Sequence, residues 1–186
     1  MARQLKKRAI EKELKFLADF EVYGVLLFVG LYFATKYVVG MDVGEKPFRL
    51  NWVSFYPLLV FSVIVLEGSF YWRNKLNVVR RKKALGALEI GRIYHKLRWL
   101  NVALLAGYLP LAIAAALAEA DLSGRIAGGL LYLMALIEQI NYFHIRLSYE
   151  TVNGALLVVE PLKKLLTGTG ERSHLRKDID AYLGLG

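Results

Sequence analysis

Four apolar stretches, each of roughly twenty residues, constrain the fold of this 186-residue chain more than any other feature. They are Val22–Gly40, Trp52–Leu66 with its continuation to Trp72, Leu100–Ala118 and Ile126–Ile145. At about 1.5 Å of rise per residue, a helix of this length crosses a hydrocarbon core of about 30 Å. The chain is also 56% hydrophobic, which is more than an ordinary soluble domain of this size carries. We therefore expect an all-α integral membrane protein with four transmembrane helices.

The basic residues predict the orientation of these helices. All but four of the 25 lysines and arginines lie before the first stretch, between the second and the third, or after the fourth. The exceptions are Lys36, Lys46, Arg49 and Arg125. Because cytoplasmic segments of membrane proteins are enriched in Lys and Arg, both termini and the middle connection are expected in the cytoplasm. The sequence predicts a multi-pass protein of the cell membrane, plasma or inner.

The chain divides into five predicted segments. Residues 1–20 are predicted as a cytoplasmic amphipathic helix that either lies on the inner leaflet or runs straight into the first span. Residues 21–76 and 99–149 are two transmembrane hairpins, 77–98 is a basic cytoplasmic loop, and 150–186 is a cytoplasmic interfacial tail. Gly40–Phe48 is predicted as an outer loop and Gly154–Leu166 as an interfacial helix. Asn51 and Ser173 are predicted helix caps, and Gly128-Gly129 predicts close helix packing.

A short pattern occurs twice, 71 residues apart. Glu67–Leu76 and Glu138–Leu147 share a glutamate, a tyrosine four residues later, an aromatic residue, a base and a leucine. The apolar runs before them align at the same offset. The sequence therefore predicts two tandem hairpins of the same orientation, a parallel pseudo-repeat.

The two glutamates lie about 9 Å inside the basic edge of their spans, at 1.5 Å per residue. A charge at the centre of a span costs roughly 2.5–3.5 kcal/mol, and somewhat less at this depth. One interpretation is structural: each glutamate accepts a bond from an asparagine or tyrosine, with Asn101 and Asn141 as candidates, or pairs with Arg98 or Arg73. Another is a proton or divalent-cation site in which both acids face each other with Glu21 nearby, and a third is a catalytic acid. The candidate polar or ion site comprises Glu67, Glu138, Tyr71, Tyr142, Asn141, His144, Arg98 and Glu21.

The middle segment also contains a block of four bases, Arg80, Arg81, Lys82 and Lys83. Such a block anchors the orientation of the neighbouring spans, and it is also suited to the phosphates of anionic lipid head groups. Both interpretations stay open from the sequence.

Several classes of function lack support in the sequence. The chain has no cysteine, and its histidines, at 95, 144 and 174, have no metal-ligand spacing. Since no catalytic or nucleotide-binding motif is present either, we expect no enzyme, metal, cofactor or nucleic-acid partner.

Two segments carry a family resemblance. Glu138–Tyr149 and Arg172–Ile179 resemble the C-terminal part of small bacterial membrane proteins with four spans, a group without an assigned activity. The resemblance implies the same class of four-span protein.

The function expected from the sequence is non-enzymatic. The chain would pack against itself or a membrane partner, with its basic flanks on the anionic lipids of the bilayer. Two other classes stay open: a small proton- or cation-linked transporter or channel that uses both glutamates, and a lipid-modifying enzyme at the cytoplasmic leaflet.

Overall fold

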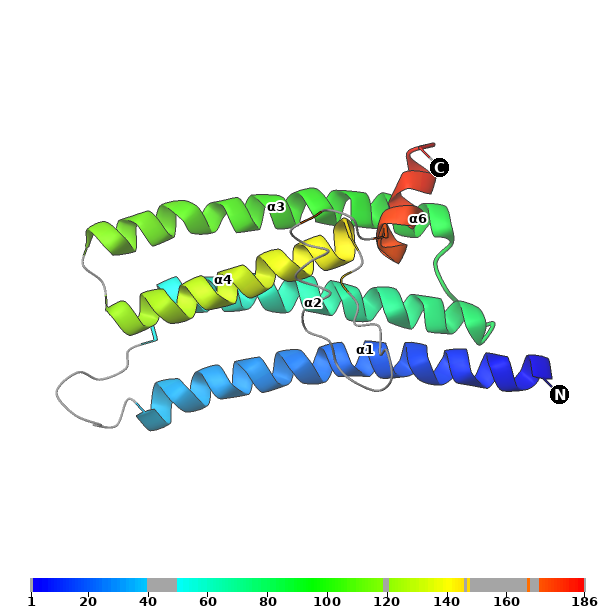
Figure 1. Ribbon diagram of the computed structural model, residues 1–186, viewed down its shortest axis with the longest axis horizontal. Coiled ribbons are helices and arrows are strands. Elements are labelled where there is room, and N and C mark those ends of the chain that lie inside the picture. The colour runs from blue at the N-terminus through cyan, green and yellow to red at the C-terminus, as the bar shows by residue number, and fades with distance from the viewer. Residues whose placement is uncertain are drawn as a thin grey trace. The chain divides into compact units, whose positions relative to one another are not determined.

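The computed structural model describes residues 2–39, 50–118, 121–145, 147, 167 and 171–185. In these ranges it contains five α-helices, shown in Figure 1: α1 (Ala2–Ala34), α2 (Trp52–Val79), α3 (Ala87–Leu117), α4 (Leu122–Phe143) and α6 (His174–Tyr182). A π-helical segment, η1 (Thr35–Val39), follows α1 directly. The first four α-helices are long and apolar enough to cross a membrane. This confirms the predicted all-α chain with four candidate spans.

The helices divide between two compact units, and α3 and α4 each contribute to both. The first unit comprises Met1–Ala84 and Leu100–Leu136, and the second comprises Leu85–Trp99 and Ile137–Gly186. The predicted outer loop Gly40–Phe48 and interfacial helix Gly154–Leu166 lie outside the described residues.

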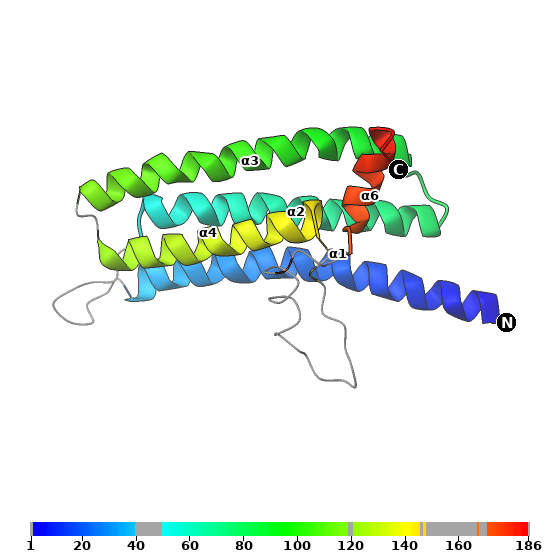
Figure 2. The ribbon, with the colours of Figure 1, turned by 45° about the horizontal axis from the view of Figure 1, so that its top comes forward.

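In the first unit, α1 and α2 lie side by side and run in opposite directions (Figures 1 and 2). Helix α1 is continuous over 33 residues, so the amphipathic segment 2–20 runs straight into the first span. The Ser69 hydroxyl of α2 donates to the Ala18 carbonyl of α1 at 2.7 Å. Nearer the cytoplasmic end predicted from the charges, Arg73 lies 3.7 Å from Asp19 and Arg80 lies 3.6 Å from Glu11. Polar contacts thus hold the two helices together over several turns.

The beginning of α2 is fixed by the predicted cap. The Asn51 side chain accepts from the backbone N–H of Val53, and the Ser54 hydroxyl accepts from the N–H of Asn51. This capping box satisfies backbone donors that a helix leaves unpaired in its first turn. Ser54 also lies 3.1 Å from the hydroxyl of Tyr32 on α1, so the cap is joined to the neighbouring helix.

Pro57 explains a close approach between α2 and α4. A proline in a helix has no N–H, so the carbonyl four residues before it, here that of Val53, loses its helical donor. Gly128 of α4 lies against this carbonyl: a Cβ at Gly128 would be 2.4 Å from the Val53 oxygen and 2.6 Å from the Tyr108 hydroxyl. Only a glycine fits there. Gly129, by contrast, faces open space, so only the first glycine of the predicted pair carries the close packing.

The middle connection is shorter than the predicted loop 77–98. Helix α2 continues to Val79 and α3 already begins at Ala87, so residues 87–98 are helical. The basic side chains in this stretch were interpreted as a sign of a loop. They are compatible with a helix that continues beyond the hydrocarbon core, because a 31-residue helix is about 46 Å long and the core is about 30 Å thick.

In the second unit, α6 packs on the first turns of α3. Ser173 caps α6, as predicted, by accepting from the N–H of Arg176. Leu175 and Ile179 are fully buried, and a Cβ at Gly91 of α3 would lie 2.5 Å from the Asp178 carbonyl oxygen. The tail helix is therefore part of the packed structure of this unit and not a free surface segment.

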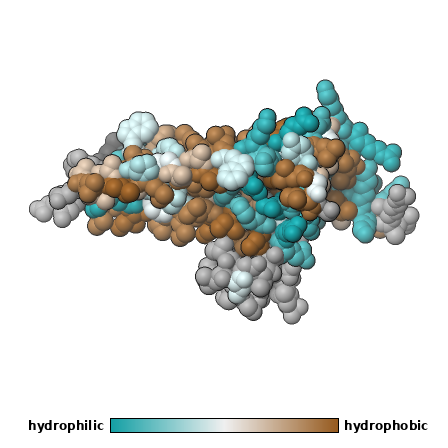
Figure 3. Space-filling view, turned by 90° about the horizontal axis from the view of Figure 1, so that it is seen from above, coloured by the Kyte–Doolittle hydropathy of each residue, from teal (hydrophilic) through white to brown (hydrophobic). Residues whose placement is uncertain are grey.

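Apolar side chains remain exposed along the long helices. In the view of Figure 3, hydrophobic residues cover much of the visible face, and hydrophilic residues gather over one part of it. On α1 the exposed apolar residues include Tyr23, Leu26, Leu27 and Leu31, each more than half exposed. A lipid environment removes the cost of such exposure, which agrees with the span lengths.

Candidate functional site

Glu67 lies in the buried interior of the first unit. Its carboxylate Oε2 accepts from the side-chain Nδ2 of Asn101 on α3 at 2.7 Å, and Asn101 is fully buried. The structure thus brings Glu67 to one of the two predicted asparagine partners. Arg73, a predicted alternative, lies beside Asp19 instead. The bond joins α2 to α3 directly.

Glu138 has a different kind of partner. Asn141, three residues later on α4, donates from Nδ2 to Glu138 Oε2 at 3.2 Å. The Asn141 side-chain oxygen in turn accepts from the backbone N–H of Leu147 at 2.9 Å. Asn141 therefore ties Glu138 to the chain that leaves α4. Glu67 belongs to the first unit and Glu138 to the second, so the proposal that they face each other stays a prediction.

The two repeated tyrosines of the candidate site are buried. Tyr71 is 1% exposed, and the ammonium of Lys75 lies 5.2 Å from the centre of its ring. Tyr142 is 6% exposed, and its carbonyl accepts from the hydroxyl of Ser173. The spacing of four residues places each tyrosine one turn after a glutamate, on the same side of the helix.

The remaining predicted residues are spread over both units. Glu21 is half-buried on α1 in the first unit. In the second unit, the Arg98 carbonyl accepts from the side chain of Gln139 at 3.4 Å, and the Arg98 guanidinium lies 5.3 Å from the Trp99 ring centre. Of the two arginines predicted as possible partners of a glutamate, Arg73 lies beside Asp19 and Arg98 beside Trp99.

His144 follows the last turn of α4 in a positively charged setting. Partial desolvation lowers its pKa below the ordinary value, and the nearby charges of Arg98 and Arg176 lower it further. A hydrogen bond to the Gln139 backbone acts in the opposite direction. The imidazole of His144 is therefore held toward its neutral form.

An acidic residue that we did not single out from the sequence organises α6. Asp180 is 3% exposed and lies 3.1 Å from the Arg172 guanidinium and 2.7 Å from that of Arg176. The signal in the sequence was the spacing of Arg176 and Asp180, since residues four apart on a helix are neighbours.

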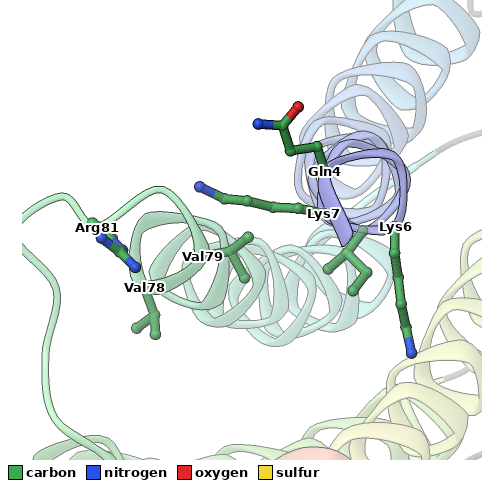
Figure 4. Close-up of a pocket in the computed structure, with 7 residues that line it drawn as sticks. Gln4, Lys6, Lys7, Val78, Val79 and Arg81 are labelled. Carbon is green, nitrogen blue, oxygen red and sulfur yellow. The ribbon is translucent and has the colours of Figure 1, made fainter. Parts of the chain in front are cut away.

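The four-base block ends α2. Arg80 is the C-cap and pairs with Glu11, and Arg81 follows in a left-handed conformation with φ of 56°. Arg81 also lines a groove between α1 and α2, which Figure 4 shows. The prediction from the sequence places the lipid-contacting bases in one segment, whereas Lys6 and Lys7 of α1 line the same groove as Arg81.

No cluster of three or more possible metal ligands occurs among the residues that the structure describes. Compared with protein-family models, with curated proteins and with solved structures, the chain matches none of them.

Proposed function

We propose that this chain is a non-enzymatic protein of the cell membrane that assembles with itself or with a membrane partner. It spans the bilayer four times as two tandem hairpins, with both termini and the basic middle connection in the cytoplasm. Its basic flanks contact anionic lipids. The excess of Lys and Arg in three segments supports the orientation, and the twofold Glu-Tyr pattern supports the repeat.

The observation that carries the non-enzymatic part of this proposal is the bond between Glu67 and Asn101, which gives the buried acid a packing role. An acid in a span is costly, and here it accepts a buried bond from the neighbouring helix at 2.7 Å. Helices in lipid associate through such polar bonds and through close packing at small residues, of which Gly128 is an example. The interior is thus organised for helix packing.

Variants at this pair test the structural role. In Glu67→Leu the buried amide of Asn101 loses its acceptor, and we expect a loss of roughly 1–3 kcal/mol of stability. Glu67→Gln keeps an acceptor and should cost much less. Adding Asn101→Leu to Glu67→Leu should recover part of the loss, because no unpaired polar group remains. Equal stabilities of all three variants would contradict a packing role.

Assembly is tested by cysteine crosslinking, since the natural chain has no cysteine. Single cysteines at exposed Leu27 and Leu31 of α1 are compared with a cysteine at buried Val25. We expect crosslinking in native membranes, to a second copy or to a partner, from an exposed position only. If single cysteines over the exposed faces of all four spans leave the protein monomeric, the assembly proposal is wrong.

One observation favours the alternative, a small proton- or cation-linked transporter or channel. The Asn101 side-chain oxygen is buried and has no hydrogen-bond partner among the described residues, and it lies on the amide that binds Glu67. A buried acceptor beside a carboxylate is suited to a proton or a cation. Flux into proteoliposomes that stops in Glu67→Gln would support this function. Flux that survives Gln at both Glu67 and Glu138 would exclude the two acids from it.

A further inference from the structure

A groove lies between the first turns of α1 and the last turns of α2, with a volume of about 530 Å³. Its basic lining residues are Lys6, Lys7 and Arg81, and its apolar lining residues are Ile10, Val78 and Val79. Figure 4 shows that Lys7 extends from α1 toward the side on which Val79 and Arg81 lie, whereas Lys6 leaves α1 on its other side. We call these residues the α1–α2 groove.

The charge of the groove is not neutralised by the nearby acid. Glu11 lies 3.7 Å from Lys7 and 3.6 Å from Arg80, so one carboxylate is shared between two bases. The pair with Arg80 connects α1 to the end of α2, whereas the pair with Lys7 lies within α1. Four bases at the groove, three of them in its lining, thus face one carboxylate, and none of the lining residues is acidic. The groove therefore has a positive charge that favours an anion.

The conformation of Arg81 is a second, independent observation. Helix α2 ends with bonds from the N–H of Lys82 to the Asn77 carbonyl and from the N–H of Arg81 to the Val78 carbonyl. This ending places Arg81 in the left-handed region, where glycine is usual because a Cβ is crowded there. Strained backbone positions of this kind are concentrated at functional sites. The backbone conformation at this position favours glycine, so the reason for an arginine here lies in its side chain.

The apolar part of the groove indicates what kind of anion it binds. Ile10 is 38% and Val78 is 54% exposed, close to the basic groups. A free phosphate can contact only the basic side chains, whereas a phospholipid has a phosphate for the basic side chains and acyl chains for the apolar ones. The location of the groove agrees with a phospholipid ligand. Helix α2 has 28 residues and is about 42 Å long, so its last turns, which line the groove, extend beyond a hydrocarbon core of about 30 Å.

We propose that the α1–α2 groove binds one anionic phospholipid, with Lys7 and Arg81 on its phosphate and with Ile10, Val78 and Val79 against its glycerol and first methylenes. This inference rests on the proposed membrane location and deepens the proposed lipid contact. It assigns the contact to two bases on two different helices. The proposed lipid contact does not include Lys82 and Lys83, because these two residues of the four-base block do not line the groove.

Lipid titration of the delipidated full chain in a non-ionic detergent tests the proposal. Native mass spectrometry counts the bound dioleoyl phosphatidylglycerol and, in parallel, dioleoyl phosphatidylcholine. Each base near an anionic surface contributes roughly fivefold to affinity, so Lys7→Gln with Arg81→Gln should weaken phosphatidylglycerol binding about 25-fold. The matched control, Lys82→Gln with Lys83→Gln, removes the same charge and should weaken binding less than about threefold.

Three results would overturn the proposal. Equal losses in the two double variants mean that binding depends on diffuse charge and not on the groove. Binding of phosphatidylcholine as tight as that of phosphatidylglycerol means that no anion is selected. Displacement of the bound lipid by inorganic phosphate at equal concentration means that the ligand is a soluble anion.

Two further measurements keep this test separate from folding and from the proposed function. Arg81→Gly suits the left-handed position, so it should fold and still lose about fivefold in phosphatidylglycerol binding. A chain that crosslinks into its assembly but binds no lipid selectively would refute this inference alone. A chain that carbonate washing removes from membranes would refute the membrane proposal as well.

Discussion

Replacement of Arg81 by glycine should stabilise this protein, although it removes a residue that we assign to lipid binding. A non-glycine residue in the left-handed region costs roughly 1–2 kcal/mol, and Arg81 has φ of 56°. Glycine avoids that cost but loses roughly 0.5–1 kcal/mol more conformational entropy on folding. The net gain is about 0.5–1 kcal/mol. At roughly 2–4 °C per kcal/mol for a chain of this length, Tm should rise by about 1–4 °C.

Thermal unfolding in one detergent, followed by circular dichroism at 222 nm, measures this shift. Arg80→Gly is the matched control, because Arg80 has φ of −81° and no left-handed strain to relieve. That variant also loses the ion pair with Glu11 and should melt lower than the natural chain. In micelles with phosphatidylglycerol the advantage of Arg81→Gly should shrink, since the bound lipid stabilises the natural chain more. If Arg81→Gly melts at or below the natural chain in lipid-free detergent, the backbone of Arg81 is not strained and the reasoning fails.

Three other predictions concern contacts within one unit or the other. Gly128→Leu should destabilise the protein by about 1–3 kcal/mol in the same thermal assay, because no side chain fits there. Gly129 faces open space, so Gly129→Leu should change the stability by less than about 0.5 kcal/mol. Similar losses of stability in the two variants would contradict the close approach. Gly91→Leu should displace α6 and make it sensitive to trypsin, since even a Cβ at this position would lie 2.5 Å from the Asp178 carbonyl oxygen. An unchanged rate of cleavage would argue against the packing of α6 on α3. The lowered pKa of His144 means that protonation opposes folding, so its contribution to stability is complete above about pH 6.5 and is lost as the pH falls toward the folded-state pKa. Melting at pH 5.5 and 7.5 should therefore differ less in His144→Gln than in the natural chain, and an equal difference in both would refute this assignment.

The helices themselves could be predicted from the sequence because long apolar runs leave few alternatives. In lipid every backbone group must be bonded within the segment, so a run such as Trp52–Trp72 has to be helical. The caps at Asn51 and Ser173 were predictable for a similar reason, since their side chains act on backbone only two or three residues away. Asn101 and Asn141 were both candidates as partners of the glutamates, and both were confirmed as such.

The ends of the helices and the contacts between them could not be predicted. Along α3 the sequence changes from basic to apolar between Arg98 and Leu100. No residue there breaks a helix, so the backbone conformation does not change with the hydropathy. Hydropathy therefore predicts where the hydrocarbon core begins and not where α3 begins. The left-handed turn at Arg81 was missed because glycine, its usual signal, is absent. Lys7 and Arg81 are 74 positions apart in the sequence, and only the pairing of α1 with α2 brings them to one groove.

The bond between Glu67 and Asn101 also has a consequence for the synthesis of this protein. The two residues are 34 positions apart, and at about 5–20 residues per second Asn101 leaves the ribosome roughly 2–7 s after Glu67. During that interval the first two helices can already be in the translocon or the bilayer, but this bond cannot form. The second helix therefore completes its polar contacts only when the third arrives. Insertion of the first hairpin and formation of the Glu67–Asn101 bond are therefore separate events. The translation rate between codons 67 and 101 sets the delay between them.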